Sequence, residues 1–177
     1  MRCLTKSEVD DFVNEGRQLS EKEGTSILDQ FERRQPLMYQ AIFGELSDGI
    51  AEVNSDMANL FLDLCFDIIL VYQKAFGNTP GKRQSKKWFD EKVALLDAEL
   101  KSLNTEDRMS NKFRQRLSNR FVERSMASGI QLELLHYLDE KVKKYSSFQS
   151  ARKKAVQVTN NLLFVVVRLM DDIYGAA

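Results

Sequence analysis

The sequence predicts an all-α fold: a single-domain multi-helix bundle of about six to eight helices around two long, central apolar helices. Two observations support this prediction. Only two prolines occur in 177 residues, and long stretches repeat their apolar residues every three or four positions, as amphipathic helices do. A chain of this length buries roughly 70% of its surface on folding, so we expect one domain over residues 1–177.

Capping residues indicate where the helices begin. Thr5 with Glu8, and Ser20 with Glu23, have the capping-box spacing, in which the hydroxyl and the carboxylate each satisfy a free backbone N–H. Pro36 suits the first turn of a helix. The expected helices, with boundaries good to a few residues, are 5–17, 20–34, 36–47, 54–76, 85–103, 105–125, 130–144 and 147–174.

Two of these helices are expected to form the middle of the bundle. In 54–76 and in 147–174, apolar residues cover most of the circumference and leave only a thin polar line. A helix that is apolar on most sides is buried on most sides. The amphipathic helices 85–103 and 130–144 are expected to pack around these two. If burial of the central pair is incomplete, the surplus apolar surface predicts a homodimer interface.

Charge divides the chain into two halves of opposite sign. Residues 1–79, the acidic half, carry 7 Lys/Arg and 14 Asp/Glu, a net charge of −7; residues 80–177, the basic half, carry 19 and 12, a net charge of +7. Such a split can indicate a nucleic acid or another polyanion as the partner of the basic half. It can equally mean that acidic helices pack beside basic ones. We favour this internal neutralisation, because a chain without net charge attracts polyanions only weakly at long range.

The densest basic cluster lies in the expected helix 105–125, where basic residues recur every fourth position. Each four-residue step turns about 400° around a helix, so only about three successive members share a face. Arginine presents a planar fork to phosphate, which suggests an anion-binding ridge. The alternative, which we favour, is a solvated face or pairing with the acidic half. The candidates for polyanion binding, here and at the start of helix 85–103, are Lys112, Arg116, Arg120, Arg124, Lys86 and Lys87.

Glu133 and His136 have the E-x-x-H spacing that places a carboxylate and an imidazole on one helix face, as in di-iron bundles. Such a site needs two of these motifs and two further glutamates. His136 is the only histidine in the chain, so one copy cannot build it. We therefore expect His136 to be a boundary residue with one hydrogen bond.

Asp63 and Asp67 lie one turn apart in the apolar helix 54–76. Paired carboxylates can hold a divalent cation or share a proton. An unpaired buried carboxylate is costly, however, so we favour a structural ion pair with Arg168 of the other central helix, or solvent exposure of this polar line.

The loop Gly77–Gly81, followed by Lys82, is similar to a phosphate-binding loop. It is one residue short, lacks the hydroxyl residue after the lysine, and follows a helix where a P-loop follows a strand. This motif therefore does not predict nucleotide binding.

Cys3 and Cys65 are too few and too far apart for a disulfide framework, so we expect reduced thiols. The N-terminus lacks the apolar core of a secretory signal, and the longest apolar run, residues 60–71, is too short to span a bilayer. We expect a soluble, cytoplasmic protein with no membrane contact and no cofactor.

Three classes of function remain. We favour a non-enzymatic helical interaction protein that acts through a dimer or a partner-protein surface. The alternative is nucleic-acid or polyanion binding through helix 105–125. The third is a metal-binding or enzymatic bundle built on acidic side chains. We assign no catalytic residue, and the candidates for a metal site are Asp63, Asp67, Glu133 and His136.

Overall fold

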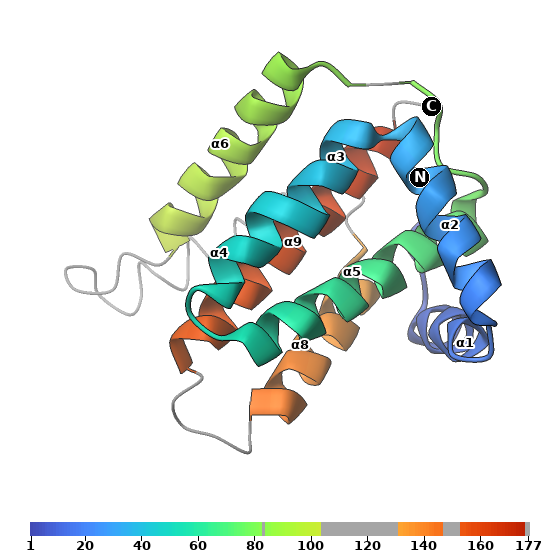
Figure 1. Ribbon diagram of the computed structural model, residues 1–177, viewed down its shortest axis with the longest axis horizontal. Helices are drawn as coiled ribbons and strands as arrows, with labels where there is room; N and C mark the ends of the chain where they lie inside the picture. Colours follow the sequence, from blue (N-terminus) through green and yellow to red (C-terminus); the bar gives the residue numbers. More distant parts are fainter. Residues whose placement is uncertain (83, 104–130, 147–152, 176–177) are drawn as a thin grey trace.

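The computed structural model describes residues 1–82, 84–103, 131–146 and 153–175, and within these ranges the chain is all-α, as predicted (Figure 1). The expected helix 105–125 lies outside the described residues, as do residues 147–152 of the last expected helix. The elements in chain order are α1 (Lys6–Gly16), α2 (Glu21–Arg34), α3 (Pro36–Gln40), the π-helix η1 (Ala41–Leu46), α4 (Ser47–Ala51), α5 (Ser55–Phe76), α6 (Lys86–Leu103), α8 (Leu132–Ser146) and α9 (Lys153–Gly175).

Both predicted capping boxes form. The Thr5 N–H donates to the Glu8 carboxylate at 2.9 Å while the Glu8 N–H donates to the Thr5 hydroxyl. Ser20 and Glu23 repeat this exchange at the start of α2. Pro36 opens α3 as its first residue, where its missing N–H breaks no intrahelical bond. Local side-chain chemistry therefore sets the beginnings of the first helices.

The expected α-helix 36–47 contains a π-helical segment, η1, that the sequence analysis did not predict. Met38, Ile42, Leu46 and Ile50 recur every fourth residue, a spacing that drifts by about 40° per step in a regular α-helix. The wider turn of a π-helix, with its i→i+5 bonding, advances less per residue and opposes this drift. Three of the four side chains are buried and Leu46 is half-buried. The π-helix thus keeps one apolar row directed at the core.

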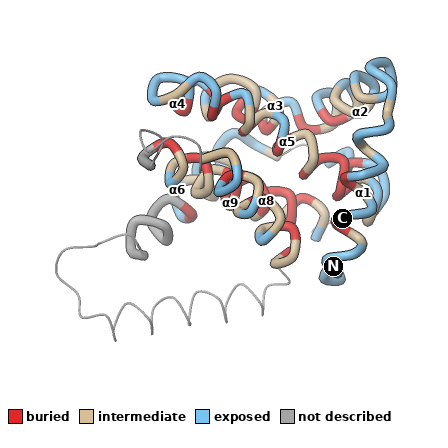
Figure 2. Tube along the Cα trace, turned by 90° about the horizontal axis from the view of Figure 1, so that it is seen from below, coloured by how far each residue is buried: buried red, intermediate tan, exposed pale blue. Residues whose placement is uncertain are grey.

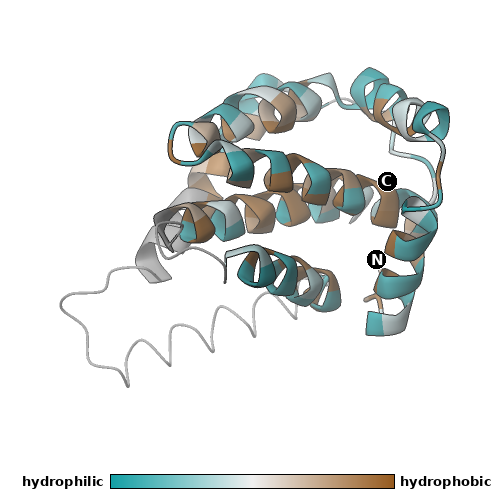
Figure 3. Cartoon of the chain, turned by 60° about the horizontal axis from the view of Figure 1, so that its bottom comes forward, coloured by the Kyte–Doolittle hydropathy of each residue, from teal (hydrophilic) through white to brown (hydrophobic). Residues whose placement is uncertain are grey.

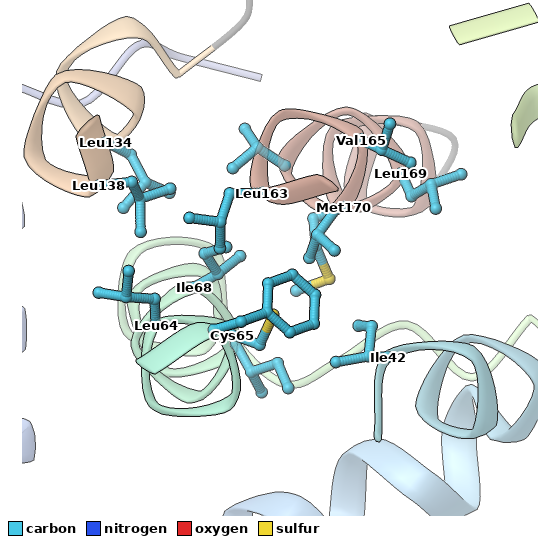
Figure 4. Close-up of a cluster of buried hydrophobic side chains, with 14 of the residues drawn as sticks. Ile42, Leu64, Cys65, Ile68, Leu134, Leu138, Leu163, Val165, Leu169 and Met170 are labelled. Atoms are coloured by element: carbon cyan, nitrogen blue, oxygen red, sulfur yellow. The ribbon is translucent and has the colours of Figure 1, made fainter. Parts of the chain in front are cut away.

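Helix α5 is the centre of the fold, as predicted. It packs against α9, α4 and α1, and also contacts α2 and α8. Its buried side chains meet those of α8, α9 and η1 in one apolar cluster (Figure 4). Figure 3 shows how the apolar residues follow the inner helices. The labelled members of the cluster are Ile42, Leu64, Cys65, Ile68, Leu134, Leu138, Leu163, Val165, Leu169 and Met170.

The apolar faces of α5 and α9 are covered within the chain itself. Among the described residues, the exposed large apolar side chains are Met1, Val53 and Leu95. The described parts of α5 and α9 therefore leave no large apolar side chain exposed for a homodimer interface. The homodimer stays a prediction, but surplus apolar surface on these two helices does not support it.

Helix α6 packs at the edge of the bundle, against α9 and α3 (Figure 1). Its inner side contributes Phe89, Val93 and the buried Leu96 to the core, while Leu95 is 61% exposed. Lys92 forms an ion pair with Asp172 of α9 at 2.9 Å. The helix therefore joins the bundle through a narrower apolar contact than α5.

Two side chains at the end of α2 hold the loop between α5 and α6 by donating hydrogen bonds to its carbonyl oxygens. Arg34 donates to the Thr79 carbonyl at 2.8 Å, and the Gln35 side chain donates to the carbonyls of Pro80 and Lys82 at 2.8 and 2.9 Å. A phosphate-binding loop instead directs its backbone N–H groups at the ligand. This geometry agrees with our rejection of the P-loop resemblance.

Both cysteines are free thiols; Cys3 is exposed and Cys65 is fully buried. Burial raises the pKa of the Cys65 thiol well above its usual range, so the thiol in the core is unreactive. Among the described helices, none combines the length and the apolar composition needed to cross a bilayer.

Gly16 marks the closest approach of α1 to α5. A Cβ at this position would clash with Cδ2 of Leu70, which is buried in α5. We predict that Gly16→Ala lowers the free energy of unfolding by about 1–3 kcal/mol, because a packed Leu70 has little room to move. Urea denaturation measures this difference.

The matched control is Gly24→Ala in α2, where the new Cβ would meet Phe66 at an ordinary 3.8 Å. There we expect a gain of up to about 1 kcal/mol, since alanine favours the helix. Equal effects at the two glycines would contradict the close α1–α5 contact.

Candidate functional site

A groove between α1 and α8 gathers charged residues from distant parts of the sequence. We call it the α1–α8 groove. Its volume is about 100 Å³, below the range of typical small-molecule pockets, which is roughly 300–1,000 Å³. It is lined by Lys6, Val9, Asp10, Glu133, His136, Tyr137 and Glu140.

The lining of this groove is acidic. Asp10 of α1 faces Glu133 and Glu140 of α8 across it, and Lys6 is the one lysine or arginine in the lining. Helical spacing explains the arrangement on α8, because residues three and four apart share a face. Three acidic residues from two helices therefore line one small groove.

Tyr137 connects the groove to the interior. Its hydroxyl donates a 2.7 Å hydrogen bond to Oδ2 of Asp67 on α5. Lys141, one turn further along α8, places its Nζ 5.0 Å from the centroid of the Tyr137 ring. Tyr137 thus forms part of the groove wall and binds α8 to α5.

The Asp67 carboxyl is half-buried, and burial raises its pKa above the usual range. The hydrogen bond from Tyr137 and the positive charges of Arg17 and Lys141 act in the opposite direction but do not outweigh burial. Burial and the Asp67 charge together raise the pKa of the Tyr137 hydroxyl. The hydrogen bond from Tyr137 and the nearby positive charges therefore offset only part of the cost of burying the Asp67 carboxylate.

The prediction that Asp67 pairs with Arg168 is wrong. Helix α8 covers the side of α5 that carries Asp67, so the residue that reaches it is Tyr137. Arg168 instead acts on Asp171 and Tyr72, whose pKa values its positive charge lowers in part. Asp63 is exposed, as our alternative of a solvent-facing polar line expected.

The structure separates the four candidates for a metal site. Glu133 and His136 line the groove, with Nδ1 of His136 3.9 Å from Oε2 of Glu133 and the imidazole 72% exposed. Asp67 lies behind Tyr137, and Asp63 faces solvent. Within the described ranges, no three His, Cys, Asp or Glu side chains gather as a metal ion would require.

The basic candidates are only partly described. Lys86 and Lys87 are both exposed in the first turn of α6, and Nζ of Lys87 lies 3.8 Å from Glu91. The other candidates, Lys112, Arg116, Arg120 and Arg124, lie outside the described residues. Their role as an anion-binding ridge stays a prediction.

The acidic half keeps its carboxylates at the surface. Of its 14 Asp and Glu residues, 12 are exposed, and Figure 2 shows the exposed outer sides of α1, α2 and α4. Its ion pairs between Arg2 and Glu8 and between Lys74 and Glu15 join residues of the same half. These two ion pairs are not the pairing between the acidic and basic halves that we favoured. Pairing with residues 108–124, outside the described ranges, stays a prediction.

Comparison with known proteins gives no relative on which to base an assignment: neither the protein-family models, nor the curated proteins, nor the solved structures contain a match to this chain.

The sequence pattern indicates Glu133, His136 and Asp67 as candidates but does not indicate Tyr137, which lines the groove with the first two and binds the third. Tyr137 follows His136 directly and lies four residues before Lys141. A hydroxyl-bearing aromatic beside apolar Leu134 and Leu138 is a signal for a half-buried hydrogen-bond donor. The contact between Tyr137 and Asp67 depends on how α8 packs on α5, and the periodicity of the sequence does not predict this packing.

We predict that Tyr137→Phe lowers the free energy of unfolding at pH 7 by about 1–2 kcal/mol, because Asp67 loses its hydrogen-bond donor. The phenol hydrogen bond favours the charged carboxylate, so the loss should shrink as acid protonates Asp67. Urea unfolding at pH 7 and at about pH 4 measures both effects.

Tyr39→Phe is the control. The ring of Tyr39 stacks on that of Phe43 with centroids 4.6 Å apart, and phenylalanine keeps this ring contact while it removes the hydroxyl. This variant should change stability by less than about 0.5 kcal/mol. A Tyr137→Phe protein as stable as the wild type at pH 7 would show that the Asp67 contact contributes nothing.

Proposed function

We propose that this chain is a non-enzymatic helical interaction protein that binds a basic partner protein, with the α1–α8 groove receiving a lysine or arginine side chain. The observation that supports it is the set of three carboxylates, Asp10, Glu133 and Glu140, around one small groove. A charged head group on a flexible stem suits a groove of this size better than a whole small molecule.

The surrounding surface supports the same choice of partner. Seven exposed carboxylates on α1 and α2, Asp10 among them, extend the negative field beyond the groove. Such a field accelerates association with a basic surface and disfavours acidic partners. A nucleic acid would be repelled from this side of the molecule.

A binding assay tests the proposal with a fluorescently labelled helical peptide that carries lysine at every fourth position. Wild-type protein should raise the anisotropy of the peptide, and the affinity should fall with salt. We predict that Glu133→Lys/Glu140→Lys weakens binding at least about tenfold, since two of the three groove carboxylates change sign.

The matched control, Glu21→Lys/Asp29→Lys, makes the same change in net charge on the exposed face of α2. It should weaken binding by less than about threefold, through the long-range field alone. Equal losses in the two variants, or no binding at tens of micromolar protein in low salt, would contradict a groove-centred function.

We keep polyanion binding as a second proposal, because Lys86 and Lys87 are both exposed in the first turn of α6. Lys82, four residues earlier in the sequence, is also exposed. If a polyanion binds there, Lys86→Glu/Lys87→Glu should reduce affinity for labelled single-stranded RNA at least about fivefold and flatten its salt dependence. Fluorescence anisotropy at two salt concentrations measures both. Unchanged affinity in this variant would remove α6 from the site.

A further inference from the structure

A second polar contact lies at the interface of the two central helices. Asp171 of α9 is 8% exposed, and it faces Tyr72 of α5, which is fully buried. The Tyr72 hydroxyl oxygen lies 2.6 Å from Oδ1 of Asp171 and 3.2 Å from the carbonyl oxygen of Val167. The other carboxyl oxygen, Oδ2, is buried without a hydrogen-bond partner.

The number of protons decides how this contact is arranged. The phenol of Tyr72 carries one proton, yet two acceptors lie within its reach. If Asp171 is ionised, that proton goes to the carboxylate and Oδ2 remains a buried, charged, unpaired oxygen. If Asp171 carries a proton on Oδ1, it donates to the Tyr72 oxygen, and Tyr72 donates to the carbonyl of Val167. The second arrangement uses both short contacts and leaves only a neutral oxygen unpaired.

Charged groups surround this contact from several elements. From α9 itself, Arg168 favours the ionised carboxylate, while Asp172 opposes it and is in turn paired with Lys92 of α6. The N-terminal amine, from the segment before α1, also favours the ionised form, and Tyr174 interacts with Tyr72. Burial outweighs the favourable charges and the Tyr72 hydrogen bond, and it raises the pKa of Asp171 to about 7.

We propose that Asp171 is a proton-dependent lock between α5 and α9: as a neutral acid it donates to Tyr72, and a rise in pH ionises it and removes this donor. Ionisation releases the carboxyl proton to solvent and breaks no covalent bond. It directs the Tyr72 proton to the carboxylate and leaves Oδ2 charged and unpaired in the core. This device goes beyond the proposed function, since it concerns the interior and not the groove.

The sign of the effect on stability follows from linkage. The carboxyl binds its proton more tightly in the folded protein than in the unfolded chain, where an Asp titrates near about 3.9. Its contribution to stability is therefore largest at acidic pH and is lost as the pH rises toward about 7. An ordinary surface carboxylate in an ion pair has the opposite dependence.

Two measurements on the full chain test the lock. Carbon-detected NMR of the Asp171 carboxyl should show a titration midpoint at about pH 7. A midpoint below about pH 5 would overturn the proposal. Urea unfolding should show that raising the pH from 6 to 8.5 lowers the folding equilibrium constant of the wild type about tenfold more than that of Asp171→Asn. The NMR titration uses wild-type protein, so the test holds even if the variant folds poorly.

Asp172→Asn is the matched control, because it removes the neighbouring carboxylate on the same helix, which is paired with Lys92 at the surface. It should keep most of the wild-type fall in stability across this pH range, because burial raises the pKa of Asp171 more than the charge of Asp172 does. If Asp171→Asn retains that fall, or if Asp172→Asn alone abolishes it, Asp171 is not the lock.

Discussion

The burial of α5 is the constraint on which the rest of the structure depends. Its apolar circumference must be covered on nearly every side, and a chain of this composition does so by wrapping α9, α4 and α1 around it. The π-helix follows from the same demand, because it keeps the apolar row of α3–η1–α4 directed at the core, where η1 and α4 contact α5. Gly16 follows from it as well, since α1 approaches α5 too closely for a side chain there.

Covering α5 also encloses polar groups that need partners. Asp67 lies on the side facing α8 and receives the Tyr137 hydroxyl, whereas Tyr72 lies on the side facing α9 and meets Asp171. Each contact joins a phenol and a carboxyl, and in each burial raises the pKa of the carboxyl. Twelve of the carboxylates of the acidic half are exposed, and one of them, Asp10, lines the α1–α8 groove. The covering of α5 thus buries two phenol–carboxyl contacts and leaves most carboxylates of the acidic half at the surface.

The sequence predicted the elements well because they depend on local patterns. The two capping boxes, Pro36 and the apolar circumference of 54–76 are properties of neighbouring residues. The errors concern tertiary packing. Arg168 was a reasonable partner for Asp67 on charge alone, but the choice between α8 and α9 depends on helix rotation. For the candidate site, Glu133 and His136 were found from the sequence, whereas Tyr137 of the same helix was missed. Asp10 was missed as well, because only the packing of α1 on α8 places it beside them.

Native-state hydrogen exchange tests the central role of α5 most directly. If α5 and α9 form the stable centre, their amides should be the slowest to exchange, at the free energy of global unfolding. The amides of α6, which packs at the edge, should exchange at least about tenfold faster through local opening. If the α6 amides exchange as slowly as those of α5, or if α5 opens first, the fold does not depend on α5.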